Sequence, residues 1–183
     1  MATVANDVVS EKYGRAFDLL DADKDGYLDW KDYQALSDRF ISAYKLDKTD
    51  RRTQSLAMAL QVQWLELLRH ANVDGERLNR DQYVSASRLA TVDTSRINYV
   101  DGTGHAFFDV IDSDGDNEIS KEEFLRLLTD VWKVTDPAAL DVFVRIDNDG
   151  DGAISRSEFI RTIREYYLSS DPEAPGSVIF GQI

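Results

Sequence analysis

Three short segments of the sequence carry acidic residues on alternate positions, a spacing that can surround a divalent cation with oxygen atoms. They are DADKDGYLDWKD (Asp21 to Asp32), DSDGDNEISKEE (Asp112 to Glu123) and DNDGDGAISRSE (Asp147 to Glu158). Calcium takes six to eight oxygen ligands, and a loop of twelve residues supplies them from positions 1, 3, 5, 7, 9 and 12. Carboxylates this close repel one another unless a cation lies between them. The sequence therefore predicts three calcium sites.

The segment from Asp147 fits every position of this pattern. Its side-chain ligands would be the carboxylates at positions 1, 3, 5 and 12, namely Asp147, Asp149, Asp151 and Glu158. Ala153 at position 7 would give its backbone carbonyl, and Gly152 at position 6 allows the positive φ of the sharp turn.

The segment from Asp112 differs at the turn. Its ligands would be, in the same order, Asp112, Asp114, Asp116 and Glu123, together with the carbonyl of Glu118. Asn117 stands where glycine is preferred, and asparagine is among the few residues that tolerate a left-handed conformation. We therefore expect this loop to bind calcium as well.

The segment from Asp21 ends in a shorter acid. Its ligands would be the side chains and one carbonyl of Asp21, Asp23, Asp25, Tyr27 and Asp32. Because Asp32 is one methylene shorter than glutamate, it would reach the ion with one oxygen rather than two. Magnesium prefers six ligands, so we expect Mg²⁺ to compete with Ca²⁺ most strongly here.

The elements around these loops are predicted to be helices. Apolar residues recur at spacings of three and four on both sides of each loop, as in Tyr13, Phe17 and Leu20 before the first. In the second and third segments, Ser at position 9 and Glu at position 12 have the spacing of a capping box. The last loop residue would then lie in the first turn of the outgoing helix. We expect an all-α fold of helix–loop–helix units.

A fourth unit is expected between the first two acidic segments, because such units pair. Residues 61–69 and 83–89 are predicted to be helical. With Leu78 as the apolar eighth residue, the ligand positions 1, 3, 5 and 12 lack carboxylates and hold Ala71, Val73, Gly75 and Gln82. We expect this unit to keep its shape without metal, and a plain helical hairpin is the alternative. In the two pairs, Leu28 would face Leu78 and Ile119 would face Ile154 through short antiparallel contacts.

The chain divides into four parts: an N-terminal pair of units (1–90), a linker (91–104), a C-terminal pair (105–168) and a tail (169–183). The linker is assigned from its polar, glycine-containing sequence, TVDTSRINYVDGTG. The tail carries the apolar residues Val178, Ile179 and Phe180. We expect them to fold back onto the helices, since exposed apolar patches are unusual.

The composition disfavours several other functional classes. A net charge of −13 argues against nucleic acid as a partner, and no apolar run is long enough to span a membrane. Cysteine is absent, which excludes disulfides and thiolate chemistry. We find no phosphate-binding loop and no nucleophile–base pair, so we expect no enzymatic activity. The N-terminus resembles no secretory signal, and we expect a cytoplasmic monomer.

The loop motifs are highly specific for EF-hands, and the chain resembles that superfamily. The order of complete and degenerate loops, and the C-terminal run TIREYYLSSDPEAPGSVIFG, are similar to sarcoplasmic calcium-binding proteins and their bacterial relative calerythrin. The resemblance covers nearly the whole chain. It implies that four EF-hands, in two pairs, fold into one compact globule, and that the metal ligands are those named above.

Three functions remain open on the sequence. A calcium buffer or storage protein needs only the ion sites. A calcium sensor opens to grip a protein target through a groove commonly rich in methionine, but this chain has only Met1 and Met58. A coelenterazine-binding protein or photoprotein would hold a small ligand in a central cavity with several histidines, and only His70 and His105 occur. We therefore favour the buffer.

Overall fold

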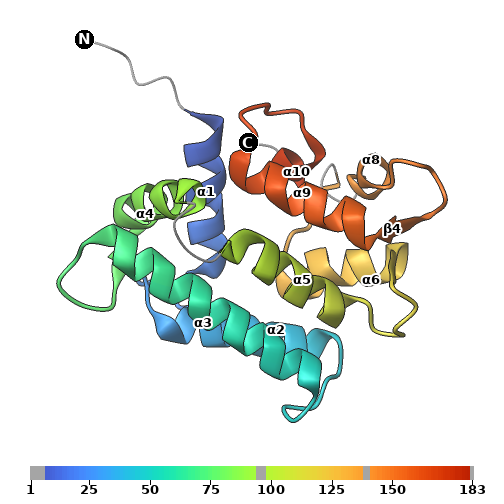
Figure 1. Cartoon of the computed structure of the whole chain (residues 1–183), viewed down its shortest axis with the longest axis horizontal. Coiled ribbons are helices and arrows are strands. Elements are labelled where there is room, and N and C mark those ends of the chain that lie inside the picture. Colours follow the sequence, from blue (N-terminus) through green and yellow to red (C-terminus); the bar gives the residue numbers. More distant parts are fainter. Residues whose placement is uncertain (1–6, 94–97, 138–140, 182–183) are drawn as a thin grey trace.

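The structure is a computed structural model that describes residues 7–93, 98–137 and 141–181 (Figure 1). The elements of its N-terminal half are α1 (Val8–Leu20), β1 (Tyr27–Leu28), α2 (Trp30–Ala43), α3 (Arg51–Ala71), β2 (Leu78–Asn79) and α4 (Arg80–Val92). Those of its C-terminal half are α5 (Tyr99–Ile111), β3 (Glu118–Ser120), α6 (Lys121–Arg126), the π-helix η1 (Leu127–Val131), α8 (Phe143–Ile146), β4 (Ala153–Ser155), α9 (Arg156–Leu168) and α10 (Pro175–Val178). The fold is mostly helical, as the sequence predicts.

The strands form two small antiparallel sheets, each joining two loops. In the first sheet Leu28 of β1 pairs with Leu78 of β2, and in the second Ile119 of β3 pairs with Ile154 of β4. All four side chains are fully buried. Both predicted pairings are confirmed. A slip of one residue would turn these apolar side chains out of the core, so their burial fixes the register.

Each helix that follows a sheet begins with a capping box. The predicted boxes are present: Ser120 caps α6 with Glu123, and Ser155 caps α9 with Glu158. Two further boxes cap α2 and α4 in the N-terminal half. In each box the side chain of the last loop residue accepts a hydrogen bond from the backbone N–H of the capping residue. The same hydrogen bond therefore fixes both the end of the loop and the start of the helix.

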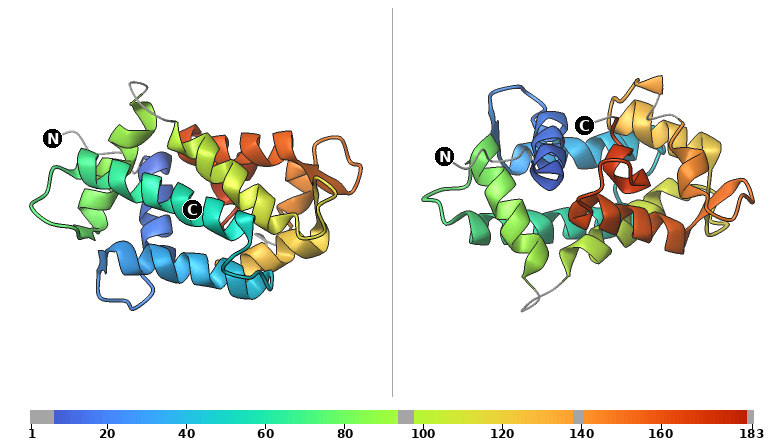
Figure 2. Two further views of the ribbon diagram at one scale, coloured as in Figure 1. Left: turned by 60° about the horizontal axis from the view of Figure 1, so that its bottom comes forward. Right: turned by 90° about the horizontal axis from the view of Figure 1, so that it is seen from above.

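The two halves share one hydrophobic core. Figures 1 and 2 show α3 running alongside α5, and α1 lying beside α9, so both ends of the chain contribute to the contact. The rings of Phe40 and Phe107 stack across the halves with centroids 4.9 Å apart. The Tyr44 hydroxyl donates to the carbonyl of Glu123 at 2.8 Å. Burying one phenylalanine is worth about 1.5–3 kcal/mol, so the halves are firmly attached.

Two helices begin earlier than the sequence suggests. Helix α3 starts at Arg51 rather than near residue 61, because the Asp50 carboxylate accepts a hydrogen bond from the Arg52 N–H at 2.8 Å and caps it. Helix α5 starts at Tyr99, so residues 99–104, which we assigned to the linker, are helical. Gly104 packs closely on α9, since a Cβ there would come within 2.9 Å of Ile160 Cδ1 and that end of the side chain would have to shift. Residues 94–97 of the predicted linker lie outside the described residues.

The tail lies against the helices. Val178, Ile179 and Phe180 are 8%, 1% and 8% exposed. The Phe180 ring centroid lies 4.8 Å from that of Trp132 and 5.2 Å from that of Tyr166. These contacts extend the shared core to α10. None of the described helices is long and apolar enough to cross a bilayer.

A buried lysine on α1 joins the first helix to the tail. Lys12 is 1% exposed, and its Nζ donates to the carbonyls of Glu165 and Ser169 at 2.9 and 2.7 Å and to Ser177 Oγ at 3.3 Å. The two carbonyls are at the C-terminal end of α9, where a cation is favoured by the helix dipole. Burial nevertheless lowers the pKa of Lys12 to about 8, although the charge of Glu165 opposes the shift.

The lowered pKa of Lys12 predicts a rise in stability at alkaline pH. Between about pH 8 and the ordinary lysine pKa of 10.5, the unfolded chain holds a proton that the folded chain has lost, so the free energy of unfolding rises with pH. Between pH 8 and pH 10, the free energy of unfolding of the unchanged protein is expected to rise by about 2 kcal/mol more than that of Lys12→Met. Urea unfolding in saturating calcium measures it. Parallel pH profiles for the two proteins would contradict the assignment.

Candidate metal centres

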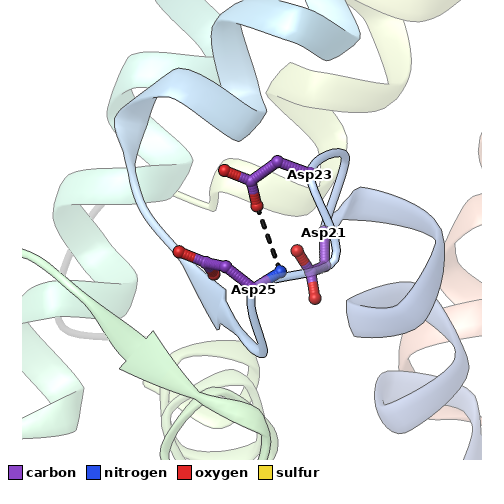
Figure 3. Close-up of side chains that lie close together, drawn as sticks. All are labelled: Asp21, Asp23 and Asp25. Atoms are coloured by element: carbon purple, nitrogen blue, oxygen red, sulfur yellow. Dashed lines mark hydrogen bonds between the residues drawn. The ribbon is translucent and has the colours of Figure 1, made fainter.

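The first loop brings three carboxylates together. Asp21, Asp23 and Asp25 each offer an oxygen, and these oxygens lie within 4.8 Å of one another (Figure 3). Asp23 Oδ1 accepts from the Asp25 N–H at 3.2 Å, and Asp21 Oδ2 accepts from the Gly26 N–H at 3.1 Å. These bonds curl the loop around the acids.

Asp21 provides a test of whether a cation fits this loop. Its side chain is buried, and its Oδ1 has no hydrogen-bond partner within the described part of the chain. A buried carboxylate oxygen without a partner is costly unless a positive charge satisfies it. The orphaned oxygen belongs to a cluster of three acids, and hard oxygen ligands of this kind are what calcium and magnesium prefer. The residues of the loop therefore fit a divalent cation.

Asp32 at the end of this loop is not among the acids whose oxygens cluster within 4.8 Å. Its two oxygens accept from the backbone N–H groups of Ala22 at 3.0 Å and Asp29 at 2.9 Å. Burial raises the pKa of Asp32, and these two hydrogen bonds oppose the shift. The acids that cluster here come from positions 1, 3 and 5, whereas the other two loops contribute position 12.

The two loops of the C-terminal half cluster a different set of acids. Oxygens within 4.8 Å of one another come from positions 1, 3 and 12, which are Asp112, Asp114 and Glu123 in one loop and Asp147, Asp149 and Glu158 in the other. Each position-1 aspartate is also the C-cap of the helix that enters the loop. The glutamate lies in the first turn of the helix that leaves it. The acids at positions 1 and 12 therefore bring the end of the incoming helix close to the start of the outgoing helix.

Hydrogen bonds hold the closing glutamates in place. Glu123 Oε1 accepts from the N–H and Oγ of Ser113 at 2.8 and 2.6 Å, and its Oε2 accepts from the Ser120 N–H at 2.9 Å. Glu158 is held in the same way by the N–H groups of Asn148 and Ser155. Burial alone would raise the pKa of each glutamate, but these bonds outweigh it and hold each pKa below its usual value. Both side chains are therefore kept ionised.

The turn residues adopt the predicted conformation in all three loops. Gly26, Asn117 and Gly152 have φ of 82°, 68° and 92°. In the last two loops, as in the first, the N–H of the turn residue donates to the position-1 aspartate, at 3.0 Å from Asn117 and 2.9 Å from Gly152. Asparagine therefore makes the same turn as glycine, and the prediction for Asn117 is confirmed.

The other predicted ligands occupy equivalent places in the loops. The carboxylates of Asp25, Asp116 and Asp151 each accept a hydrogen bond from the N–H two residues later, at 2.9, 2.9 and 3.0 Å. Those N–H groups belong to the residues predicted to give carbonyl ligands, which start strands β1, β3 and β4: Tyr27, Glu118 and Ala153. Asp116 and Asp151 are not among the oxygens clustered within 4.8 Å.

The second loop of the N-terminal half has the shape of the others without their acids. Its strand β2 and the helix α4 follow in the same order, and Gln82 at position 12 bonds back to the Asn79 N–H at 2.9 Å. Asn72 turns the chain at the start with φ of 49°. Within the described residues, the groups of acids able to hold a metal lie in the other three loops.

Two residues near the loops were not foreseen from the sequence. Ser113 supplies a hydroxyl to Glu123, and the only signal for it is a hydroxyl residue at position 2 of the loop. Arg77, in the loop without acids at the ligand positions, forms an ion pair with Asp25. The predicted pairing of Leu28 with Leu78 brings the two loops side by side, but the direction in which the long Arg77 side chain extends does not follow from the sequence.

Comparisons with known proteins identify the class. Residues 105–165 match the model of an EF-hand domain pair, and residues 15–37 match that of an EF hand. These two segments are therefore EF-hand domains, and the described residues include three candidate metal sites. It is similar to a sarcoplasmic calcium-binding protein of Perinereis vancaurica tetradentata, at 28% identity over 120 residues, which are 65% of this chain and 67% of the relative.

Solved structures share the fold at lower identity. A calcium-binding protein of Streptomyces coelicolor superposes with a TM-score of 0.71 at 23% identity, covering 87% of this chain and 97% of that one. The magnesium-loaded apo form of berovin, a light-sensitive ctenophore photoprotein, superposes with a TM-score of 0.68 at 20% identity, covering 85% and 86%. All three calcium-binding loops of berovin bind magnesium ions.

Glu158→Gln removes the closing carboxylate of the last loop and keeps its size. Because affinity follows the number of charged ligands, calcium binding at that loop is expected to weaken more than about tenfold, or 1.4 kcal/mol. Titration calorimetry should show one fewer tight site than in the unchanged protein. Glu173→Gln, an exposed residue of the tail, is the matched control. Unaltered stoichiometry in Glu158→Gln would refute the assignment of this ligand.

Proposed function

We propose that this protein is an intracellular calcium buffer or storage protein with three metal sites. The observation that carries the proposal is the single core shared by the two halves, into which Phe40, Phe107 and the tail residue Phe180 are packed. Three acidic loops attached to such a core can bind ions without the separation of helices that a sensor undergoes. On this proposal, binding the ions is the whole of the function, and the protein acts as a monomer in the cytoplasm.

The proposed architecture is four EF-hands in two pairs. The N-terminal pair would comprise the metal-binding first hand and the second hand around Leu78, whose strand supports β1. The C-terminal pair, with two binding hands, is supported by the match to the domain-pair model. This order is that of sarcoplasmic calcium-binding proteins, and we extend the likeness to calerythrin. The domains would be 1–90, the C-terminal pair predicted at 105–168, and a tail from 169. Because α5 begins at Tyr99, we extend the C-terminal domain to start there, which shortens the linker predicted at 91–104.

The proposed ligands are those of the loop pattern. The side-chain ligands would be Asp21, Asp23, Asp25, Asp32, Asp112, Asp114, Asp116, Glu123, Asp147, Asp149, Asp151 and Glu158, and the carbonyl ligands Tyr27, Glu118 and Ala153. The clusters of acids at positions 1 and 3 in all three loops support this set. When bound, the ion supplies the positive charge that each cluster lacks.

The sensor alternative would need an apolar surface that a protein target could cover. Several exposed large apolar side chains, Met58, Leu65 and Val144, come from α3 and α8, and single exposed residues of this kind are ordinary for a folded protein. Leu89, Val92 and Leu168 line one open surface groove beside α1, which is the feature that favours a sensor most.

The small-ligand alternative rests on one interior cavity. It is lined by aromatic residues that include Tyr33, Phe107, Trp132 and Phe180, and it has a volume of about 40 Å³. A cavity of this size accepts one or a few water molecules, whereas sites for small organic ligands measure roughly 300–1,000 Å³. The packed interior therefore supports the buffer over a chromophore-binding protein.

Calcium is expected to reduce the apolar surface that the protein exposes. Without metal, uncompensated carboxylates loosen the three loops and the helices they join, so a hydrophobic dye should bind the chelator-treated protein better and be released when calcium is added. The melting temperature should rise at the same time. A large calcium-induced increase in dye fluorescence would contradict the buffer and favour a sensor.

Asp32→Glu is expected to convert the first site from a magnesium-tolerant to a calcium-selective one. A longer side chain can reach the ion with both oxygens, which adds a ligand that calcium accommodates and octahedral magnesium does not. The ratio of calcium to magnesium affinity should increase about tenfold at this site, as measured by calcium titration in a magnesium background. Asp38→Glu on the exposed face of α2 is the control. Equal selectivity in both variants would rule out this role of Asp32.

A further inference from the structure

A basic side chain of the second loop, which has no acids at the ligand positions 1, 3, 5 and 12, contacts an acid of the first loop. The antiparallel pairing of β1 with β2 sets Leu28 opposite Leu78, and Arg77 immediately precedes Leu78. The Arg77 guanidinium forms an ion pair with Asp25 Oδ2. It also lies over the ring of Tyr27, 4.5 Å from its centroid. The strand pairing therefore fixes the backbone next to Arg77, and the Tyr27 ring and the Asp25 carboxylate hold its guanidinium.

Asp25 differs in this contact from the other clustered acids. Among the acids of the three metal groups in the described chain, Asp25 is the one that forms an ion pair with a basic side chain. The C-terminal pair of loops also has an arginine that reaches across, Arg156. Its guanidinium instead contacts the neutral Asn117 Oδ1, at 3.2 and 3.3 Å, and Asp109, which precedes the loop. A cross-loop arginine is thus present in both pairs, but only in the first does it neutralise a clustered acid.

We propose that Arg77 is a built-in counter-cation that lowers the affinity of the first loop for divalent ions and stabilises that loop when it is empty. This inference rests on the proposed function, because it takes the first loop to be a metal site. A fixed positive charge a few ångströms from a divalent ion repels it, and it also relieves the repulsion among Asp21, Asp23 and Asp25 before the ion arrives. The second hand, which on this proposal binds no ion, then sets the ion concentration at which the first hand becomes occupied.

The size of the effect follows from the exposure of the pair. The side chains of Arg77 and Asp25 are 50% and 41% exposed, so water and salt screen the interaction. Removing the charge is expected to strengthen ion binding at the first loop by about three- to tenfold at low salt. The difference should shrink as the ionic strength rises, because the screening length falls.

Terbium luminescence can report on the first loop separately. The residue at position 7 is Tyr27 in this loop, whereas it is Glu118 and Ala153 in the other two. Light absorbed by a tyrosine at this position is transferred to a bound terbium ion, so the sensitised emission arises mainly from the first site. Calcium added to the terbium-loaded protein displaces the emission and gives the calcium affinity of that site.

The test compares Arg77→Gln with two controls. Arg77→Lys keeps the charge, and Arg80→Gln removes a nearby charge that pairs with Asp18 at 3.5 Å, outside the acid cluster. Arg77→Gln should shift the terbium and calcium midpoints to three- to tenfold lower concentrations and lower the melting temperature in chelator. Both controls should stay within about twofold of the unchanged protein.

Two outcomes would overturn the inference. Arg77→Gln could leave the midpoints where they are, or weaken binding, which would mean that the arginine holds Asp25 in position for the ion rather than competing with it. Circular dichroism of the calcium-loaded variants checks that all fold. An unchanged protein without sensitised emission would instead contradict the first metal site, and with it the proposed function, so the two failures are distinguishable.

Discussion

Repulsion among carboxylates at the ends of helices is the constraint on which the structure depends. Asp21, Asp112 and Asp147 are each the C-cap residue of an incoming helix, where the negative end of the helix dipole disfavours an acid. Each also faces further acids of its own loop. The rest of the fold holds the loops in place against this repulsion, and a bound divalent cation would neutralise it. Metal binding and stability are therefore linked at the same atoms.

The rest of the fold resists that repulsion in two ways. Capping boxes fix the end of each loop to the helix that follows, and the same glutamates that close the C-terminal loops accept the capping hydrogen bonds. The short sheets fix each loop to its neighbour through fully buried pairs such as Leu28 with Leu78. A loop that binds no metal can therefore still be necessary, since it supplies the second strand and, through Arg77, a charge.

The sequence predicts the local parts of this arrangement well and the distant parts poorly. The acid spacing, the turn at Asn117 and the register of Ile119 with Ile154 follow from short-range rules, and all were foreseen. The early start of α3 depends on a single cap, Asp50, ahead of the polar stretch RRTQS. The helix at Tyr99 contains two glycines, which are typical of a linker, and the close packing at Gly104 is visible only once α9 lies beside it. The loop pairing was predicted, but the direction of the long Arg77 side chain was not.

The contacts of α1 join it to residues at the C-terminal end of α9, more than 150 positions later in the chain. Lys12 and Tyr13 bond to the carbonyls of Ser169 and Tyr167, and Tyr166 donates back to the carbonyl of Lys12. Partners so far apart in the chain are slow to find each other, because a long loop must close before they meet. During synthesis α4 is available to α1 long before α9 is, so one face of the first helix can pack while the hydrogen bonds of Lys12 and Tyr13 are still missing. The two faces of α1 therefore acquire their neighbours at different times, and the face toward α9 is completed later.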